Sequence, residues 1–156
     1  MSAESGGGLV VRPVVRGDAT VLFRWLNAAD RIATSFQTSG PVAWEDHVAW
    51  LDRHLADAGH WHAIALYGGQ PAGQVRIERI GGNPVISIYV DVDFRKLGVG
   101  RRMIDAASET ARQRWPGQPL LAQIRNDNPG SVAFFERNGF SEVDRRADRI
   151  ILRRFP

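Results

Sequence analysis

Residues 88–103 read IYVDVDFRKLGVGRRM, and this stretch decides how the rest of the chain is organised. The β-branched and aromatic residues that lead into it predict a strand over 85–92. Two glycines, Gly98 and Gly100, follow in a basic turn. Beyond them, apolar residues recur at three- and four-residue spacing and predict a helix with one buried face: Met103, Ile104, Ala107 and Ala111. The order is therefore strand, glycine turn, helix.

The turn between this strand and this helix has the chemistry of an anion site. Glycine has no Cβ, so a ligand can approach the backbone closely at Gly98 and Gly100. The first helical turn offers N–H groups with no acceptor inside the helix, and the helix dipole adds positive potential. Basic side chains surround the glycines: Arg95, Lys96, Arg101 and Arg102. An ordinary strand–helix connection is the alternative, but the combination favours a diphosphate site.

Periodicity and turn residues predict the remaining elements. Strands are expected over 9–15, 61–67, 72–79, 120–125, 140–143 and 149–152. Helices are expected over 18–26, 42–55 and 128–138, and the helix of the opening motif should stop at Trp115-Pro116. Glycine turns join the strands 61–67, 72–79 and 85–92, which therefore predict an antiparallel meander leading into the glycine loop.

Composition excludes several classes of protein. The chain has 156 residues and 44% hydrophobic content, enough for one compact domain. It contains no cysteine, which excludes disulfides and cysteine nucleophiles. No apolar stretch has bilayer length and no signal peptide is visible, so a soluble, cytoplasmic protein is expected. The excess positive charge of +3 is dispersed, and this argues against a nucleic-acid or membrane partner. His47 and His54 lack the spacing of a helical zinc site, and no metal is expected.

The glycine loop resembles the acyl-CoA loop of the GNAT superfamily of N-acetyltransferases, because it reads Arg95-x-x-Gly98-x-Gly100. It has neither the third glycine of the dinucleotide fingerprint nor the Gly-Lys-Ser/Thr of the P-loop. A second segment, NPGSVAFFERNGF over 128–140, is similar to the family pattern Asn-x-x-Ser/Ala-x-x-x-Tyr/Phe-Glu-Lys-x-Gly-Phe. The two motifs cover the C-terminal half of the chain in the family's order.

This resemblance implies an α/β (α+β) fold in a single GNAT-type domain over 9–156, after a flexible lead-in over 1–8. The family's sheet is mixed, has six to seven strands and is flanked by about four helices. It is splayed into a V between the strand of the opening motif and the strand 120–125. The resemblance implies a monomer or a homodimer.

Acetyl-CoA is the cofactor that the resemblance implies, and it would enter the gap of the V. Backbone groups of Val90 and Val92 would hold the pantetheine arm, and Asn128, Ser131 and Phe135 would lie against it from the other side. The diphosphate would lie on the loop and the first helical turn, on Arg95, Lys96, Leu97, Gly98, Val99, Gly100, Arg101 and Arg102.

The catalytic residues are less clearly indicated. Many relatives have a tyrosine that protonates the thiolate at the position of Phe135, and phenylalanine has no proton to give. Tyr89 and Ser131 are candidate donors, with water as the alternative. Glu78, next to the motif strand, and Asp91, on that strand, are candidate general bases, although each is equally well explained as a solvated charge.

The N-terminal half resembles the branch of the superfamily that acetylates nucleotide-linked amino sugars, best known from pseudaminic acid biosynthesis. The likeness lies in Trp25-x-Asn27-x-x-x-Arg31-x-x-x-Ser35-Phe36 and in the segment from Glu45 to Leu51. It implies an amino-sugar acceptor. Aromatic side chains would stack on a sugar or base and arginines would bind a diphosphate. The expected acceptor residues are Trp25, Asn27, Arg31, His47, Trp50, Arg76, Gln123 and Arg125.

Other functions stay open at this point. The acceptor amine could belong to a peptide N-terminus, an amino acid or an antibiotic. A non-catalytic acyl-CoA-binding module is a further alternative, because Phe135 stands where relatives have the tyrosine.

Overall fold

The computed structural model describes residues 8–33 and 40–156. Within them the chain forms seven strands: β1 (Leu9–Pro13), β2 (Trp61–Tyr67), β3 (Gln70–Ile80), β4 (Asn83–Val90), β5 (Leu120–Arg125), β6 (Ser141–Arg145) and β7 (Arg149–Arg154). The described helices are α1 (Ala19–Leu26), α2 (Ala29–Ala33), α3 (Trp44–Leu55), α4 (Val99–Arg114) and α5 (Pro129–Arg137), with 3-10 turns η2 (Arg16–Asp18) and η3 (Val92–Phe94). No helix among these described residues is long and apolar enough to cross a membrane.

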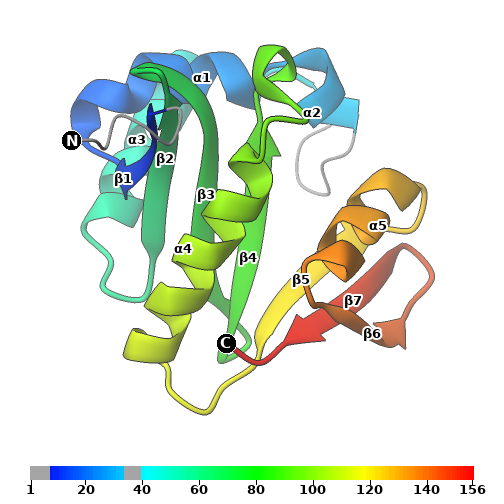
Figure 1. The fold of residues 1–156 in the computed structure, drawn as a ribbon. Helices are drawn as coiled ribbons and strands as arrows, with labels where there is room; N and C mark the ends of the chain where they lie inside the picture. The colour runs from blue at the N-terminus through cyan, green and yellow to red at the C-terminus, as the bar shows by residue number, and fades with distance from the viewer. Residues whose placement is uncertain (1–7, 34–39) are drawn as a thin grey trace.

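All seven strands belong to one mixed sheet, in the order β1-β2-β3-β4-β5-β7-β6. Every neighbouring pair is antiparallel except β4 and β5, which run parallel. That pair is joined at Val85–Leu121 and Ile86–Ala122 alone. Beyond this junction the two strands diverge, and the sheet opens into the V that is visible in Figure 1. The predicted meander and the predicted split are therefore confirmed.

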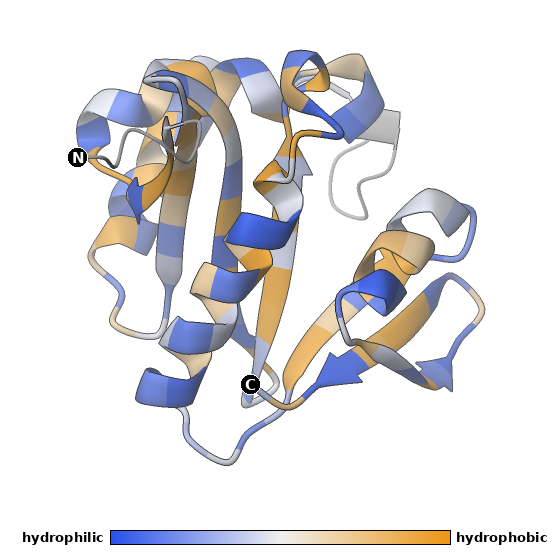
Figure 2. Ribbon diagram, viewed as in Figure 1, coloured by the Kyte–Doolittle hydropathy of each residue, from blue (hydrophilic) through white to orange (hydrophobic). Residues whose placement is uncertain are grey.

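The larger core lies between the sheet and helix α4. Figure 2 shows apolar residues along the strands and on the inward side of α4. Inward side chains alternate along the strands with period two, as on Val75 and Ile77 of β3. They meet the predicted helix face, of which Met103, Ile104, Ala107 and Ala111 are each fully buried. This contact fixes the start of α4 beside the open end of the split.

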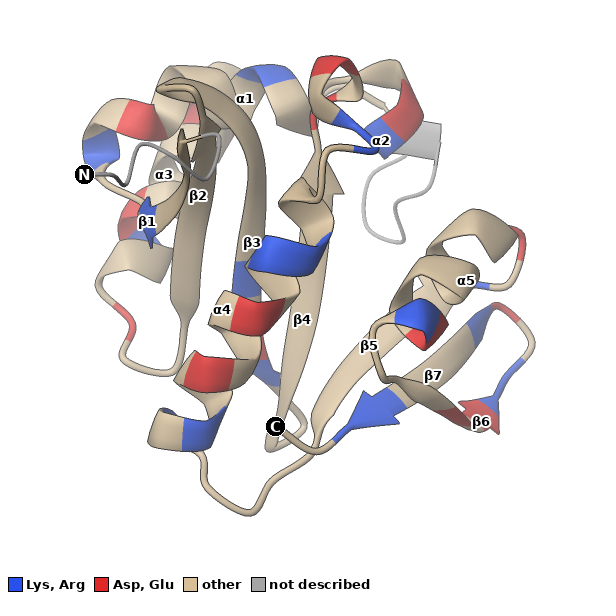
Figure 3. Ribbon diagram, viewed as in Figure 1, with Lys and Arg blue, Asp and Glu red and all other residues tan. Residues whose placement is uncertain are grey.

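Helices α1 and α3 cover part of the opposite face of the sheet. Their smaller core contains Leu22, Trp25 and Leu51, packed on Ile64 of β2. Figure 3 shows that charged residues lie mainly on the outer sides of the helices and near the ends of the strands. On β3, however, Arg76 and Glu78 project to the same face as this smaller core, since they alternate with Val75 and Ile77. A polar row therefore runs beside α3.

Two features of the opening motif differ from the prediction. The strand ends at Val90, not at Val92, because the chain turns into η3. Asp91 lies outside the strand, where its carboxylate accepts a hydrogen bond from the N–H of Asp93 and caps η3. Val92 is 65% exposed in that turn and has no strand backbone to offer a ligand.

Helix α2 was not predicted, because it is only one turn long and has no clear apolar period. Ser35 and Phe36, part of the acceptor motif, lie outside the described residues, as does most of the expected lead-in.

Candidate active site

The glycine loop, residues 95–102, has the backbone geometry of an anion site. Gly98 has φ +84° and is the N-cap of α4, and Lys96 also has a positive φ of 65°. The first bond within the helix runs from the N–H of Arg102 to the carbonyl of Gly98 at 3.1 Å. The N–H groups of Val99, Gly100 and Arg101 precede that bond, so the helix supplies no acceptor for them. They are available to an anion at the positive end of a sixteen-residue helix.

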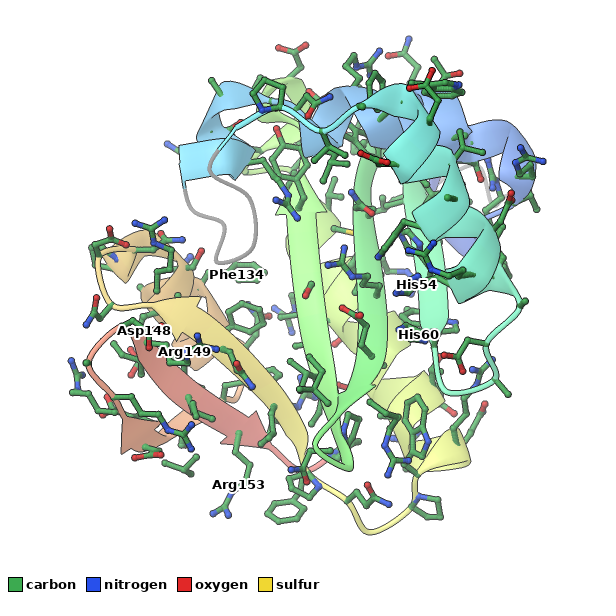
Figure 4. All side chains as sticks on the ribbon, turned by 180° about the vertical axis from the view of Figure 1, so that it is seen from behind. His54, His60, Phe134, Asp148, Arg149 and Arg153 are labelled. Carbon is green, nitrogen blue, oxygen red and sulfur yellow. The ribbon has the colours of Figure 1, made fainter. Side chains whose placement is uncertain are left out.

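The second glycine of the loop is required by packing as well. A Cβ on Gly100 would lie 2.8 Å from the ring of Phe134 in α5. No side chain fits at that distance unless the ring moves. Phe134 therefore reaches across from the C-terminal half of the sheet to the first turn of α4, and the sequence motifs of 95–100 and 128–140 meet at this point. Figure 4 shows Phe134 beside the open end of the split.

The basic side chains of the loop are of two kinds. Arg95 points back toward β4: its Nε donates to the carbonyl of Val90 at 3.0 Å and its guanidinium pairs with Asp30 of α2. Lys96, Arg101 and Arg102 are exposed. The carbonyl of Val90, expected to hold the pantetheine arm, therefore already accepts a bond from Arg95.

A cavity of about 460 Å³ lies along the split between β4 and β5. Its wall combines apolar residues of both strands with polar side chains of β3, β5, β7 and α5. We call it the arginine pocket, because among the described residues that line it the charged ones are Arg31, Arg76, Arg125, Arg149 and Glu78. Figure 4 shows Arg149 on β7, beside Asp148 at the start of that strand.

The three predicted contacts from α5 line this pocket. Asn128 is the N-cap of α5: its Oδ1 accepts from the N–H of Ser131 and its Nδ2 donates to the Ser131 hydroxyl at 3.0 Å. Phe135 is 7% exposed and packs edge-on against Phe134 and Phe140. Capping of α5 is by itself a sufficient reason for an asparagine at 128 and a serine at 131. Their contact with a cofactor therefore stays a prediction.

Three of the candidate catalytic residues lie in different surroundings. Glu78 lines the arginine pocket, but both its oxygens have partners: Arg76 Nε at 3.1 Å and His60 Nε2 at 3.2 Å. Burial raises the pKa of Glu78, but the charge of Arg76 and the bonds from His60 and Arg76 outweigh it and leave the pKa below its usual value. The Asp91 carboxylate accepts from Trp25 Nε1 at 2.7 Å and does not line this pocket.

Tyr89 is the third candidate and lines the arginine pocket. Its hydroxyl donates to Asp30 at 3.1 Å. Burial, together with this hydrogen bond to a carboxylate, raises the pKa of Tyr89 to about 12. A phenol with this pKa gives up its proton less readily than an ordinary tyrosine does.

The predicted acceptor residues divide into core and pocket. Trp25 is 1% exposed and His47 is 2% exposed, so both rings are packed in the core, although His47 also lines the hollow beside Trp50. The Nε2 of His47 donates to the carbonyl of Ala19 at 3.0 Å, and burial lowers the pKa of this histidine. Asn27 exchanges two hydrogen bonds with the backbone of Val42. These residues hold α1 and α3 together. The others line the arginine pocket or the hollow next to it, which shares Arg31 and Arg76: Arg31, Trp50, Arg76, Gln123 and Arg125.

Two residues of the arginine pocket, Arg149 and Gln74, and one residue outside it, Asp30, were not predicted from the sequence. Arg149 lies opposite Arg125 in the register of β5 and β7, and its Nη1 donates to Gln123 at 2.7 Å. Gln74 lines the pocket and accepts from Nε2 of His62 at 2.6 Å. Asp30 joins Tyr89 to Arg95. Strand register brings the first two into the pocket, and no local motif encodes it.

A mixed sheet split between two parallel strands, with a glycine loop and a helix N-terminus at the open end, defines an α/β domain of the N-acetyltransferase type. The model of the acetyltransferase (GNAT) family matches residues 26–140, so the chain belongs to this family of acyltransferases.

Known structures share this fold. A domain from Methanocaldococcus jannaschii matches with a TM-score of 0.80 at 19% identity, covering 93% of this chain and 96% of that one. A ribosomal-protein-alanine N-acetyltransferase from Brucella melitensis matches with a TM-score of 0.79 at 22% identity, covering 94% and 99%. The spermidine N-acetyltransferase of Vibrio cholerae, solved in complex with CoA and spermine, matches with a TM-score of 0.78 at 16% identity, covering 93% and 92%.

One curated relative is an uncharacterized N-acetyltransferase of Methanocaldococcus jannaschii. The match is 30% identical over 90 residues, and it covers 52% of this chain and 39% of that protein. The chain therefore matches less than half of that relative's length.

Proposed function

We propose that this protein transfers the acetyl group of acetyl-CoA to a primary amine on a nucleotide-linked amino sugar. The observation that carries the proposal is the lining of the arginine pocket, where four arginines from four separate elements accompany one carboxylate. An acceptor with a diphosphate and a single amine complements such a lining.

The cofactor would occupy the other side of the split. Its diphosphate would bind the free N–H groups of Val99 to Arg101, and the exposed Lys96 and Arg102 would neutralise its charge. Its pantetheine arm would follow the diverging edge of β4. This arm would deliver the thioester to the point where the split meets the arginine pocket, close to Phe135. The solved Vibrio cholerae relative, whose complex contains CoA, supports this choice of cofactor.

The charge of the pocket decides between classes of acceptor. Spermidine and spermine are polycations, and a pocket with this arginine content would repel them. Arg125 and Arg149 form ion pairs with Asp127 and Asp148, whose side chains are each 61% exposed. Pairs this exposed contribute little stability, so a phosphate could compete for the guanidinium groups.

Surrounding cations also supply the chemistry that the reaction needs. The attacking amine must be neutral, and nearby guanidinium groups lower the pKa of an ammonium ion. We propose that the acceptor therefore loses its proton to water on binding, and that Glu78 orients Arg76 rather than acting as base. Water would protonate the departing thiolate, since Phe135 has no proton to give. Proximity of the amine to the thioester would then account for most of the rate acceleration.

An acceptor screen tests this proposal. Release of free CoA thiol from acetyl-CoA is measured with a nucleotide-linked 4-amino sugar, spermidine, single amino acids and short peptides. We expect turnover with the sugar nucleotide and none with spermidine. Turnover confined to peptides or amino acids would reject the sugar acceptor and retain the acetyltransferase. Calorimetric binding of acetyl-CoA without turnover on any amine would instead indicate a non-catalytic acyl-CoA-binding module.

A further inference from the structure

A cluster of two histidines and one carboxylate lies beside the arginine pocket, and neither the fold nor the proposed reaction accounts for it. Among the described residues, His54, His60 and Glu78 form a group whose potential ligand atoms all lie within 4.8 Å of one another. They come from the end of α3, the segment before β2, and β3. Figure 4 shows the two histidine side chains next to each other on the face of the sheet that α3 covers.

The distances from the two histidines to Glu78 suit a metal site. His54 Nε2 lies 3.4 Å and His60 Nε2 lies 3.2 Å from the same oxygen, Oε2 of Glu78. Ligands about 2.0–2.1 Å from a tetrahedral zinc ion are separated from each other by about 3.3–3.4 Å. The observed separations therefore leave room for one ion at the centre without moving the side chains far. All three side chains are mostly buried, with 16% to 20% of their surface exposed.

The outer nitrogens of both rings are already anchored. Nδ1 of His54 donates to the carbonyl of Trp50, one turn earlier in α3, at 2.8 Å. Nδ1 of His60 donates to Oδ2 of Asp57 at 2.9 Å, while the other oxygen of Asp57 accepts from the N–H of Gly59. Metal-binding histidines characteristically donate their second N–H to a carboxylate or a backbone carbonyl in this way. In the neutral form of each ring the proton lies on Nδ1, and the Nε2 lone pair then faces Glu78.

Three acceptor atoms that face one another repel unless a positive charge lies between them. Arg76 does not supply it, because its Nε bonds the other oxygen of Glu78, Oε1, at 3.1 Å. That pair instead orients the carboxylate with Oε2 toward the histidines. The charge must therefore be a proton on one of the rings or a metal ion.

We propose that His54, His60 and Glu78 bind a divalent first-row transition-metal ion, with Zn²⁺ as the reference case. Two imidazole nitrogens and one carboxylate oxygen suit Zn²⁺ and its neighbours in the series, and do not suit Mg²⁺ or Ca²⁺, which prefer oxygen ligands. The ion would join the C-terminal end of α3 and the following loop to β3. It would also fix Glu78 and Arg76 at the edge of the arginine pocket. The sequence did not predict this site, because the spacing of His47 and His54 was tested there, whereas the histidines that lie together in the structure are His54 and His60.

Zinc binding by the full chain, free of any affinity tag and of bound metal, tests the proposal. Calorimetry and the metal content after gel filtration should give one Zn²⁺ per chain, and Co²⁺ should produce the visible absorption bands of a four-coordinate site. His54→Ala and His60→Ala should each weaken binding by more than about 100-fold, with the fold of each variant checked by circular dichroism.

A matched pair of variants separates the site from general surface charge. Asp57→Asn removes the carboxylate behind His60 and should weaken binding by about 10–100-fold. Asp52→Asn makes the same change at an equally exposed carboxylate, which pairs with Arg16 instead, and should leave binding unchanged. A wild-type chain that binds no Zn²⁺ at about 0.1 mM would assign the cluster to a proton and overturn the proposal. Undiminished binding by the double variant H54A/H60A would overturn it equally.

Discussion

The glycine loop and the arginine pocket lie at the same split in the sheet but are built in opposite ways. The loop offers backbone N–H groups, and its shape requires that Gly100 carry no side chain, because a Cβ there would lie 2.8 Å from the ring of Phe134. The pocket offers side chains from six different elements, held by strand register and by ion pairs. A backbone site is therefore damaged by added bulk, whereas a side-chain site is damaged by removed charge. Substitutions at Gly100 and Arg149 test this distinction directly.

The largest effect is expected from bulk in the loop. Gly100→Glu would place a side chain against the ring of Phe134, which a Cβ alone approaches to 2.8 Å, and would bring a negative charge to the diphosphate site. We expect the affinity for acetyl-CoA, measured by calorimetry, to fall by at least about 1000-fold. Gly17→Glu is the control, because a Cβ on Gly17 meets nothing within 4 Å. Unimpaired binding by the Gly100 variant would remove the cofactor from this loop.

The next largest effect is a loss of folding stability at low pH. His62 supports Gln74 on the polar face, and burial lowers its pKa from 6.5 to about 4. Between these pH values the unfolded chain binds a proton at His62 that the folded chain does not, so the free energy of unfolding decreases as the pH falls. The loss from this residue should approach about 3 kcal/mol at pH 4. Urea unfolding from pH 7 to 4.5 should show a shallower pH dependence for His62→Gln than for the wild type. Identical slopes would contradict a neutral buried His62.

Removal of one pocket charge should have a smaller effect. Arg149→Gln should raise the KM for the sugar-nucleotide acceptor by about 10-fold and leave the affinity for acetyl-CoA unchanged, since the lost contact binds the ground state. Arg153→Gln provides the matched control, because Arg153 is on the same strand but does not line the pocket. Equal effects of the two variants would mean that overall charge, and not the pocket, attracts the acceptor.

The smallest effect is expected where a group is added. Phe135→Tyr places a hydroxyl at the position from which many relatives donate a proton. If water now protonates the thiolate, kcat should rise by up to about 10-fold, with the affinity for acetyl-CoA unchanged. Steady-state kinetics with the acceptor found in the screen would measure this. A rate that stays at the wild-type value would indicate that another group already donates the proton.

The sequence predicted the loop well because its information is contiguous. A strand, two glycines and a helix face lie within 85–111, and their periods can be read directly. It predicted the pocket only in part. Arg149 lines the pocket because β7 pairs with β5 in a particular register. Trp25 and His47 do not line it, because α1 and α3 pack their rings into the smaller core. Aromatic side chains on a helix have the same spacing whether they contact a substrate or the core, so tertiary packing decides between the two.

The short junction of β4 and β5 also has a dynamic consequence. With hydrogen bonds at only two residue pairs, the segment from β5 to β7 can separate from the rest of the sheet at less cost than β2 can leave β3. A cofactor that contacts both β4 and β5 would hold the two strands together. Its binding free energy would then stabilise the segment from β5 to β7 against separation. Amide hydrogen exchange should then slow selectively in β5 and β7 when acetyl-CoA binds, because the rigidity of this arm of the sheet depends on the ligand.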